Sequence, residues 1–233
     1  MLLYIIRHGE PGHDGALTPL GQQQAQAVGE RMAKVGLDRI FTSPLLRARQ
    51  TAEPACERLG LTAQVEEWAA EIGDGRLTVL PDGTKKSVSL IQNTEFLCDG
   101  HADLPFSRAY ECPYFCTSGM KDAVSYIEQN GNAFLEKLGY RKEGDVYRIV
   151  RASDEKVALF CHAAFSRAFI SVLLHIPIHI MWAGFDYEHT GVTVLEFENN
   201  ENGITAPTCL RYSDTSHLYA AGIEPLVFDK REM

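Results

Sequence analysis

Two histidines in the 233-residue sequence each come soon after a short apolar run. His8 follows Met1–Ile6 and Arg7, and His162 follows Val157–Cys161. Such runs are typical of strands that are buried on both faces. In an open parallel sheet, ligands bind beyond the carboxyl ends of the strands. Either histidine alone is more typical of a strand that ends at the surface, but the pair at equivalent positions predicts one shared site.

Two arginines stand close to these positions in the predicted structure. Arg7 precedes His8, and Arg47 falls in the first turn of a predicted helix. A guanidinium group matches the geometry of phosphate oxygens and stays charged. A helix N-terminus adds N–H groups and positive potential, and Gly9 lets the backbone approach a ligand. Arg47 alone is typical of a solvated helix residue, but the combination predicts a pocket for one phosphoryl group.

Strand and helix patterns alternate around these residues. Thr18 and Pro19 are typical of a helix start, and Gly36 of its end. Alternation of this kind predicts a three-layer α/β/α sandwich with a mostly parallel sheet. The expected strands are Met1–Ile6, Ile40–Phe41, Val65–Glu71 (or an extended piece), Tyr147–Val150, Val157–Cys161, Val192–Phe197 and Ala206–Tyr212, and the expected helices are Pro19–Val35, Pro44–Leu59, Met120–Leu138 and Ala163–His175.

The segment 73–117 has a weak pattern of glycines, prolines and isolated aromatic residues. We expect it to be an insertion of loops and short elements that forms a lid over the site. The rest of the chain gives no sign of a domain boundary, so residues 1–233 are predicted to form a single domain that includes this insertion.

The amino-acid composition argues against several classes of protein. The chain has 31 acidic and 22 basic residues and a net charge of −9, which argues against a broad nucleic-acid footprint. The longest apolar region, Val157–Phe185, is interrupted by charged residues and a proline, so no membrane span and no membrane partner are expected. Six cysteines are too few for a disulfide scaffold, and a zinc site at Cys112 and Cys116 lacks a matching second pair. We expect a cytoplasmic protein. The sequence leaves open whether the protein forms a homodimer.

Four motifs resemble those of the histidine phosphatase superfamily, the phosphoglycerate-mutase-like phosphatases. Arg7–Glu10 resembles the R-H-G-E signature, and Leu17–Gly21 resembles L-T-x-x-G. Ser43–Ala52 resembles S-x-L-x-R-A-x-x-T-A, and Phe160–His162 resembles the late strand with the second histidine. The ending Asp214–Tyr219 is similar to the S-H-L-Y of an uncharacterised bacterial branch. The resemblance implies a phosphoglycerate mutase-like fold.

The resemblance also implies roles for individual residues. His8 would be the nucleophile that becomes phosphorylated, while Arg7, Arg47 and His162 would bind the phosphoryl group of a small phosphorylated substrate. Glu71 lies in a stretch similar to W-L-x-E-F and is the predicted proton donor. The competing carboxylates are those of Glu66, Glu67 and Asp74. No metal and no other cofactor are implied.

Three further residues are candidates for binding the substrate: Glu10, Asp14 and His217. Asp14 stands where several members of the family carry Asn, and His217 belongs to the S-H-L-Y ending. Ala163 and Ala164 follow His162 where glycine is usual, which puts a close backbone approach to phosphate in doubt. The other histidines near loops and helix ends, His13, His175, His179 and His189, are predicted to be structural or exposed.

The predicted activity is that of a metal-independent phosphomonoesterase. A phosphoglycerate mutase is the nearest alternative, although no L-N-E-R-x-x-G stretch surrounds Glu71. A non-catalytic module that binds a phosphorylated ligand is another, supported by Ala163 and Ala164. The fourth hypothesis for the function is a metal-dependent hydrolase.

Overall fold

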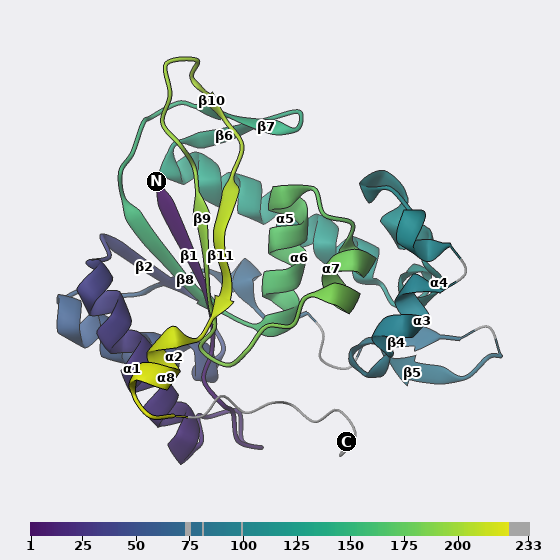
Figure 1. Ribbon diagram of the computed structural model, residues 1–233, viewed down its shortest axis with the longest axis horizontal. Helices are drawn as coiled ribbons and strands as arrows, with labels where there is room; N and C mark the ends of the chain where they lie inside the picture. Colours follow the sequence, from purple (N-terminus) through teal and green to yellow (C-terminus); the bar gives the residue numbers. More distant parts are fainter. Residues whose placement is uncertain (73–75, 81, 99, 224–233) are drawn as a thin grey trace.

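The computed structural model describes residues 1–72, 76–80, 82–98 and 100–223 (Figure 1). Within these residues, a six-stranded sheet has the order β11-β9-β1-β8-β2-β3. Its parallel part comprises β1 (Leu2–Arg7), β8 (Lys156–Cys161), β2 (Arg39–Thr42) and β3 (Gln64–Val65), and β9 (Val192–Glu196) and β11 (Thr208–Asp214) add antiparallel strands at one side. The predicted fold class, a mixed α/β protein with a largely parallel sheet, is confirmed.

Alternate residues of β1 face opposite sides of the sheet. Leu3 and Ile5 belong to one hydrophobic core and Tyr4 and Ile6 to the other, as the two-residue period of a strand requires. Helices α1 (Pro19–Val35) and α2 (Leu46–Leu59) cover the second face, and α5 (Met120–Leu138) and α6 (Ala163–Leu174) cover the first. Both strand faces are therefore buried, which explains why the side chains of β1 up to Ile6 and of β8 from Val157 onward are apolar.

The α1 helix begins and ends where its sequence predicts. The Oγ1 of Thr18 accepts a hydrogen bond from the N–H of Gly21, and Gly36 adopts a φ of 73° at the end. Its Gly29 packs against α2 so closely that an added Cβ would lie 2.7 Å from Cβ of Pro54. The two helices therefore touch through a position that has no room for a side chain.

Some expected elements have bounds that differ from the prediction. The α2 helix begins at Leu46, because Leu45 is extended and the hydroxyl of Ser43 contacts another part of the chain. The expected strand from Val65 to Glu71 ends at Val65 and continues as a short 3₁₀ helix, η1 (Glu67–Ala69). The chain turns there because the Trp68 ring packs against aromatic rings of α5 and α6.

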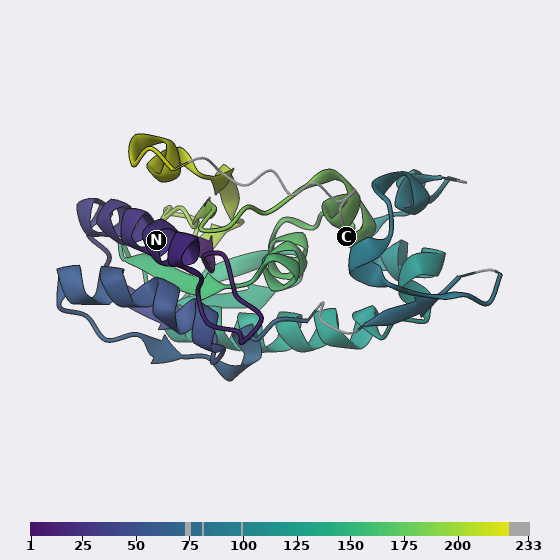
Figure 2. The same cartoon turned by 90° about the horizontal axis from the view of Figure 1, so that it is seen from below.

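Smaller elements complete the fold. The chain folds into a second sheet from β6 (Tyr140–Glu143), β7 (Val146–Ile149) and β10 (Ile204–Thr205). The late strand expected at Ala206–Tyr212 starts two residues later, as β11. Two further helices are α7 (Ile178–Gly184) and α8 (Ser216–Ala220), and α8 lies beside α1 in both views (Figures 1 and 2).

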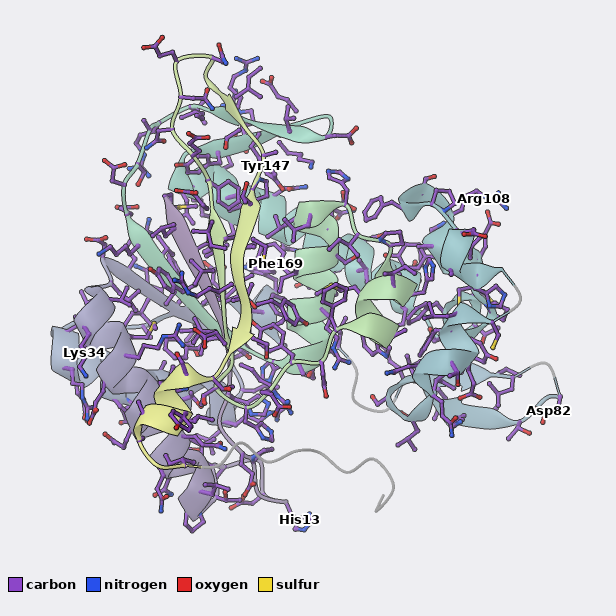
Figure 3. The ribbon with its side chains drawn as sticks, viewed as in Figure 1. His13, Lys34, Asp82, Arg108, Tyr147 and Phe169 are labelled. Atoms are coloured by element: carbon purple, nitrogen blue, oxygen red, sulfur yellow. The ribbon has the colours of Figure 1, made fainter. Side chains whose placement is uncertain are left out.

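The predicted insertion contains several short elements in its described parts. They are β4 (Leu77–Val79), β5 (Lys85–Ser87), η2 (Val88–Leu90), α3 (Asn93–Leu97), η3 (His101–Asp103), η4 (Phe106–Glu111) and α4 (Pro113–Cys116). They lie at the end of the molecule away from α1 and α2, with Asp82 and Arg108 at the outer edge (Figures 2 and 3). Phe115 of α4 contacts the ring of Trp182 in α7, so the insertion packs on α7.

Candidate active site

The two strand-end histidines lie next to each other. Strands β1 and β8 are parallel neighbours in which Arg7 pairs with Cys161, so the next residue of each strand is a histidine. The N–H of His8 donates to the carbonyl of Cys161 over 2.9 Å, and the ring centroids of His8 and His162 are 5.1 Å apart. The sheet register thus brings two residues together that are far apart in the sequence.

The ring nitrogens of His8 have different partners. Nδ1 lies 2.6 Å from the carbonyl oxygen of Gly9, and Nε2 accepts a hydrogen bond from Nε of Arg47 over 3.1 Å. A carbonyl only accepts and a guanidinium only donates, so the proton is on Nδ1 and the lone pair on Nε2. Burial, with the charge of Arg7, holds the pKa of His8 well below its usual value. His8 is therefore a neutral imidazole whose Nε2 has a nucleophilic lone pair.

Arg7 is held by the loop that precedes β9. One of its terminal nitrogens donates to the carbonyl of Tyr187, and the other lies 2.9 Å from Nε2 of His189. Burial lowers the pKa of Arg7 to about 10, so the guanidinium still carries its charge at neutral pH.

Arg47 is held through the first turns of α2. The hydroxyl of Thr51 donates to the carbonyl of Arg47 over 2.7 Å and accepts from the N–H of Gly9 over 2.9 Å. Thr51 therefore joins α2 to the segment after β1. This link places Arg47 beside His8.

His162 is oriented by a serine from the other side of the site. Its Nε2 lies 2.7 Å from Oγ of Ser43, and the N–H of Ser43 donates to the carbonyl of Phe160 over 2.8 Å. Burial, together with the nearby His8, lowers the pKa of His162 to about 2, so this ring is neutral as well. Ser43 opens the S-x-L-x-R motif, but its contact with His162 was not predicted from the sequence.

Glu71 lies at the N-terminus of α6, directly beyond His162. One carboxylate oxygen accepts from the N–H of Phe165 over 2.9 Å, and the other from the N–H of Ala164 over 3.3 Å. The N–H groups that follow His162 are thus accessible to a carboxylate although glycine is replaced by alanine. The charge of Glu71 also acts on Arg7, which places the carboxylate near the phosphoryl-binding candidates.

The competing carboxylates are arranged differently. Glu66 accepts a hydrogen bond from the indole N–H of Trp68 over 2.7 Å, and Glu67 is exposed. Asp74 lies outside the described residues. Glu71 therefore has the clearest geometric connection to His162 among the described candidates.

The three candidates for substrate binding have contacts with other parts of the protein. Glu10 accepts from the hydroxyl of Thr18 over 2.7 Å, and Asp14 accepts from the N–H of Ala16 in an exposed turn. His217 is buried, with Nδ1 3.2 Å from Arg31 and Nε2 3.0 Å from the hydroxyl of Thr190. The ring of His217 thus contacts protein groups at both nitrogens.

His189 lies beside the site, although no sequence motif indicated it. It was predicted to be structural or exposed; its ring is buried, contacts Arg7 and has its centroid 5.7 Å from that of His8, so it is not exposed and it lies beside the site. The antiparallel register of β9 on β1, with Val192 opposite Ile6, brings the preceding loop to the end of β1. A strand starting at Val192 is the signal that could have located it.

The other histidines lie elsewhere. His13 is exposed at the outer tip of the loop after β1 (Figure 3). His175 ends α6 with a φ of 53°, and His179 is buried in α7. Within the described ranges there is no helix long and apolar enough to cross a membrane, and no group of three or more His, Cys, Asp or Glu side chains suited to a metal ion.

The sheet order and the overall likeness to solved structures place the fold in the phosphoglycerate mutase-like class of α/β folds. A family model, the histidine phosphatase superfamily (branch 1), matches residues 3–88 and 121–209, which is more than half of the chain. This protein belongs to the histidine phosphatase superfamily. The unmatched residues between 88 and 121 fall largely within the predicted insertion.

Curated relatives match part of the chain. A probable phosphoglycerate mutase GpmB from Erwinia tasmaniensis is 33% identical over 85 residues, which cover 32% of this chain and 40% of the relative. The protein of the same name from Klebsiella pneumoniae is 33% identical over 105 residues, which cover 40% of this chain and 45% of the relative. The matches thus span less than half the length of these relatives.

Solved structures match nearly the whole chain. A phosphoserine phosphatase from Entamoeba histolytica, in complex with 3-phosphoglyceric acid, has a TM-score of 0.60 at 24% identity and covers 93% of this chain and 98% of that one. A mycobacterial glucosyl-3-phosphoglycerate phosphatase with VO3 has a TM-score of 0.60 at 21% identity and covers 92% of this chain and 99% of that one. At these identities the likeness shows the fold.

Proposed function

We propose that this protein hydrolyses phosphate monoesters through a phosphohistidine on His8. The observation that carries the proposal is the pair of contacts of His8, whose Nδ1 faces the Gly9 carbonyl and whose Nε2 accepts from Nε of Arg47. Family membership supports a phosphoryl-transfer activity in general. In the first step, Nε2 bonds to phosphorus while the bond from phosphorus to the leaving oxygen breaks.

Arg7, Arg47 and His162 would bind the oxygens of the transferred group. The incoming phosphoryl group would replace the hydrogen bond between Arg47 and His8, so that the guanidinium group lies beside the phosphoryl oxygens. Phosphoryl transfer depends mostly on positioning and on stabilising charge, and two fixed guanidinium groups supply positive charge. The reaction proposed here is therefore metal-independent, and activity should persist in excess EDTA.

Glu71 would protonate the leaving oxygen in the first step. The resulting carboxylate would then take a proton from water as the water oxygen attacks phosphorus and the bond from phosphorus to Nε2 breaks. Its place beside His162 and near Arg7 supports this role. General acid–base catalysis of this kind contributes about 10²–10⁴ to the rate.

The substrate would be a small phosphorylated metabolite. His8 is only 4% exposed, so a small terminal group reaches Nε2 more easily than a phosphate in the middle of a large surface. The solved relatives named above are phosphatases of phosphoserine and of glucosyl-3-phosphoglycerate, which are small molecules of this class. We also propose that the insertion contributes to substrate choice as a lid.

The experiment that tests the function compares wild type, His8→Ala and His13→Ala. With p-nitrophenyl phosphate, wild type and His13→Ala should turn over alike, and an acid-labile phosphoprotein should be trapped in both. His8→Ala should lose turnover and the trapped phosphate. Full turnover by His8→Ala would refute the proposal.

A phosphoglycerate mutase activity is the second candidate, because the curated relatives carry that name. Interconversion of 3- and 2-phosphoglycerate, with the bisphosphate as primer, separates the two. Phosphate release without interconversion supports the phosphatase, and interconversion faster than release supports the mutase.

A further inference from the structure

We infer that His189 is a positioning residue for Arg7: its Nε2 accepts a hydrogen bond from the guanidinium group and so sets the direction in which Arg7 faces the phosphoryl group. The inference rests on the proposed function, because it concerns how a phosphoryl-binding arginine is held. His189 comes from a loop that the family motifs quoted above do not include.

The contact between the two side chains has a defined direction. Nη2 of Arg7 lies 2.9 Å from Nε2 of His189, and Nη1 donates to the carbonyl of Tyr187. A guanidinium group has donors and no acceptor, so Nε2 of His189 must carry a lone pair. The two terminal nitrogens of Arg7 are therefore fixed by two acceptors that stand two residues apart in one loop.

The environment of His189 keeps that lone pair in place. The residue is 3% exposed, and burial together with the charge of Arg7 lowers its pKa to about 3. A protonated ring would direct an N–H group at the arginine and repel it. At neutral pH the ring is thus a permanent acceptor.

The loop itself is anchored on the far side of His189. Thr190 has a φ of 54°, which is unfavourable for a β-branched residue, and its N–H donates to the carbonyl of His8 over 3.2 Å. Its hydroxyl donates to the carbonyl of His189 over 2.7 Å and contacts Nε2 of His217 over 3.0 Å. The backbone of His189 is thereby tied to His8, so its side chain has a fixed place from which to hold Arg7.

Without this acceptor, Arg7 would respond to the carboxylates whose charges act on it. These include Glu71, Asp186 and Glu188. A guanidinium group drawn toward Asp186 or Glu188 would be turned away from the phosphoryl oxygens. The expected effect is weaker binding of phosphate as well as slower turnover.

Three substitutions separate the hydrogen bond from the bulk of the ring. His189→Leu removes the acceptor, His189→Gln places a carbonyl oxygen near the position of Nε2, and His189→Asn reaches only as far as Nδ1. The matched control is His179→Leu, which changes a buried histidine of α7. The measurements are the Kd of inorganic phosphate by calorimetry, kcat and KM with p-nitrophenyl phosphate, and the Tm.

We expect His189→Leu and His189→Asn to weaken phosphate binding and to lower kcat/KM by at least about tenfold, with His189→Gln recovering most of both. His179→Leu should leave the Kd near that of wild type. Equal Kd values for the Leu and Gln variants, or wild-type binding by the Leu variant, would overturn the inference.

The phosphate measurement also separates this inference from the proposed function. The wild-type protein could hydrolyse no ester while the phosphate Kd values of wild type and the three His189 variants keep the expected order. That result would refute the phosphatase and support the role of His189. A wild-type protein that binds no phosphate refutes the inference.

Discussion

The Oγ of Ser43 lies 2.7 Å from Nε2 of His162, although the two residues are 119 positions apart in the sequence. Both side chains are buried, and Oγ of Ser43 also accepts from the N–H of Leu45 over 3.2 Å, which leaves its own proton to donate to His162. The contact joins the segment before α2, which carries Arg47, to the end of β8. It therefore relates the positions of two phosphoryl-binding candidates.

Ser43→Ala should disturb His162 more than it disturbs the fold. Loss of a partner for a buried polar group costs about 1–3 kcal/mol, and we expect kcat/KM to fall at least about tenfold. The control is Ser171→Ala, which removes a buried hydroxyl that donates to the carbonyl of Ile176. Urea unfolding should show comparable losses for the two variants, while steady-state kinetics should show a loss for Ser43→Ala alone. Equal kinetic losses would contradict this interpretation.

Arg47→Lys tests the geometry of the guanidinium group. A lysine keeps the charge but has no Nε–H in a rigid fork, so it cannot reproduce the contact with Nε2 of His8. We expect kcat/KM to fall by about 10²-fold. Arg49→Lys, at an exposed position two residues later, should retain wild-type kinetics. If the Arg47→Lys enzyme were as active as the Arg49→Lys enzyme, charge alone would suffice.

Glu71→Gln tests the proton donor. The amide oxygen can still accept from one of the two N–H groups of α6, so the fold should keep most of its stability, but the side chain can neither donate nor take up the catalytic proton. We expect kcat to fall by about 10²–10⁴, with phosphohistidine accumulating from an aryl phosphate that has a good leaving group. Glu67→Gln is the exposed control. Normal turnover of an alkyl phosphate by Glu71→Gln would assign the proton transfer to another group.

Acid should destabilise the protein through its buried histidines. Burial lowers the pKa of His217 to about 4, below the value of about 6.5 expected in the unfolded chain. Between these values the unfolded state binds more protons, so the free energy of unfolding is fully present above pH 6.5 and decreases as the pH falls toward 4. His162 and His189, with pKa values of about 2 and 3, act in the same direction.

Urea unfolding at several pH values measures this effect. His217→Gln should reduce the slope of the unfolding free energy against pH by up to about 1.4 kcal/mol per unit between pH 6 and pH 4. The exposed His13→Gln should leave the slope as it is. A wild-type protein whose stability is constant from pH 6.5 to 5 would show that these rings are protonated in the folded state.

Local sequence patterns predicted several of the strands and helices that position the site. Thr18, Pro19 and Gly36 delimit α1 because capping and left-handed backbone depend on residues within a few positions. The apolar runs that end at His8 and His162 became β1 and β8 because strands buried on both faces need apolar side chains throughout. In contrast, the strand expected up to Glu71 stops early, since the burial of Trp68 against α5 and α6 is a tertiary effect.

The sequence by itself determined where β1 and β8 end, the first helix and the residue types that could bind a phosphoryl group, because each of these depends on near neighbours. Only the tertiary structure decided that Ser43 holds His162, that His189 holds Arg7 and that His217 contacts Thr190. These pairs are joined by sheet order and register across long stretches of chain. No local sequence pattern predicts a hydrogen bond between residues that are so distant in the sequence.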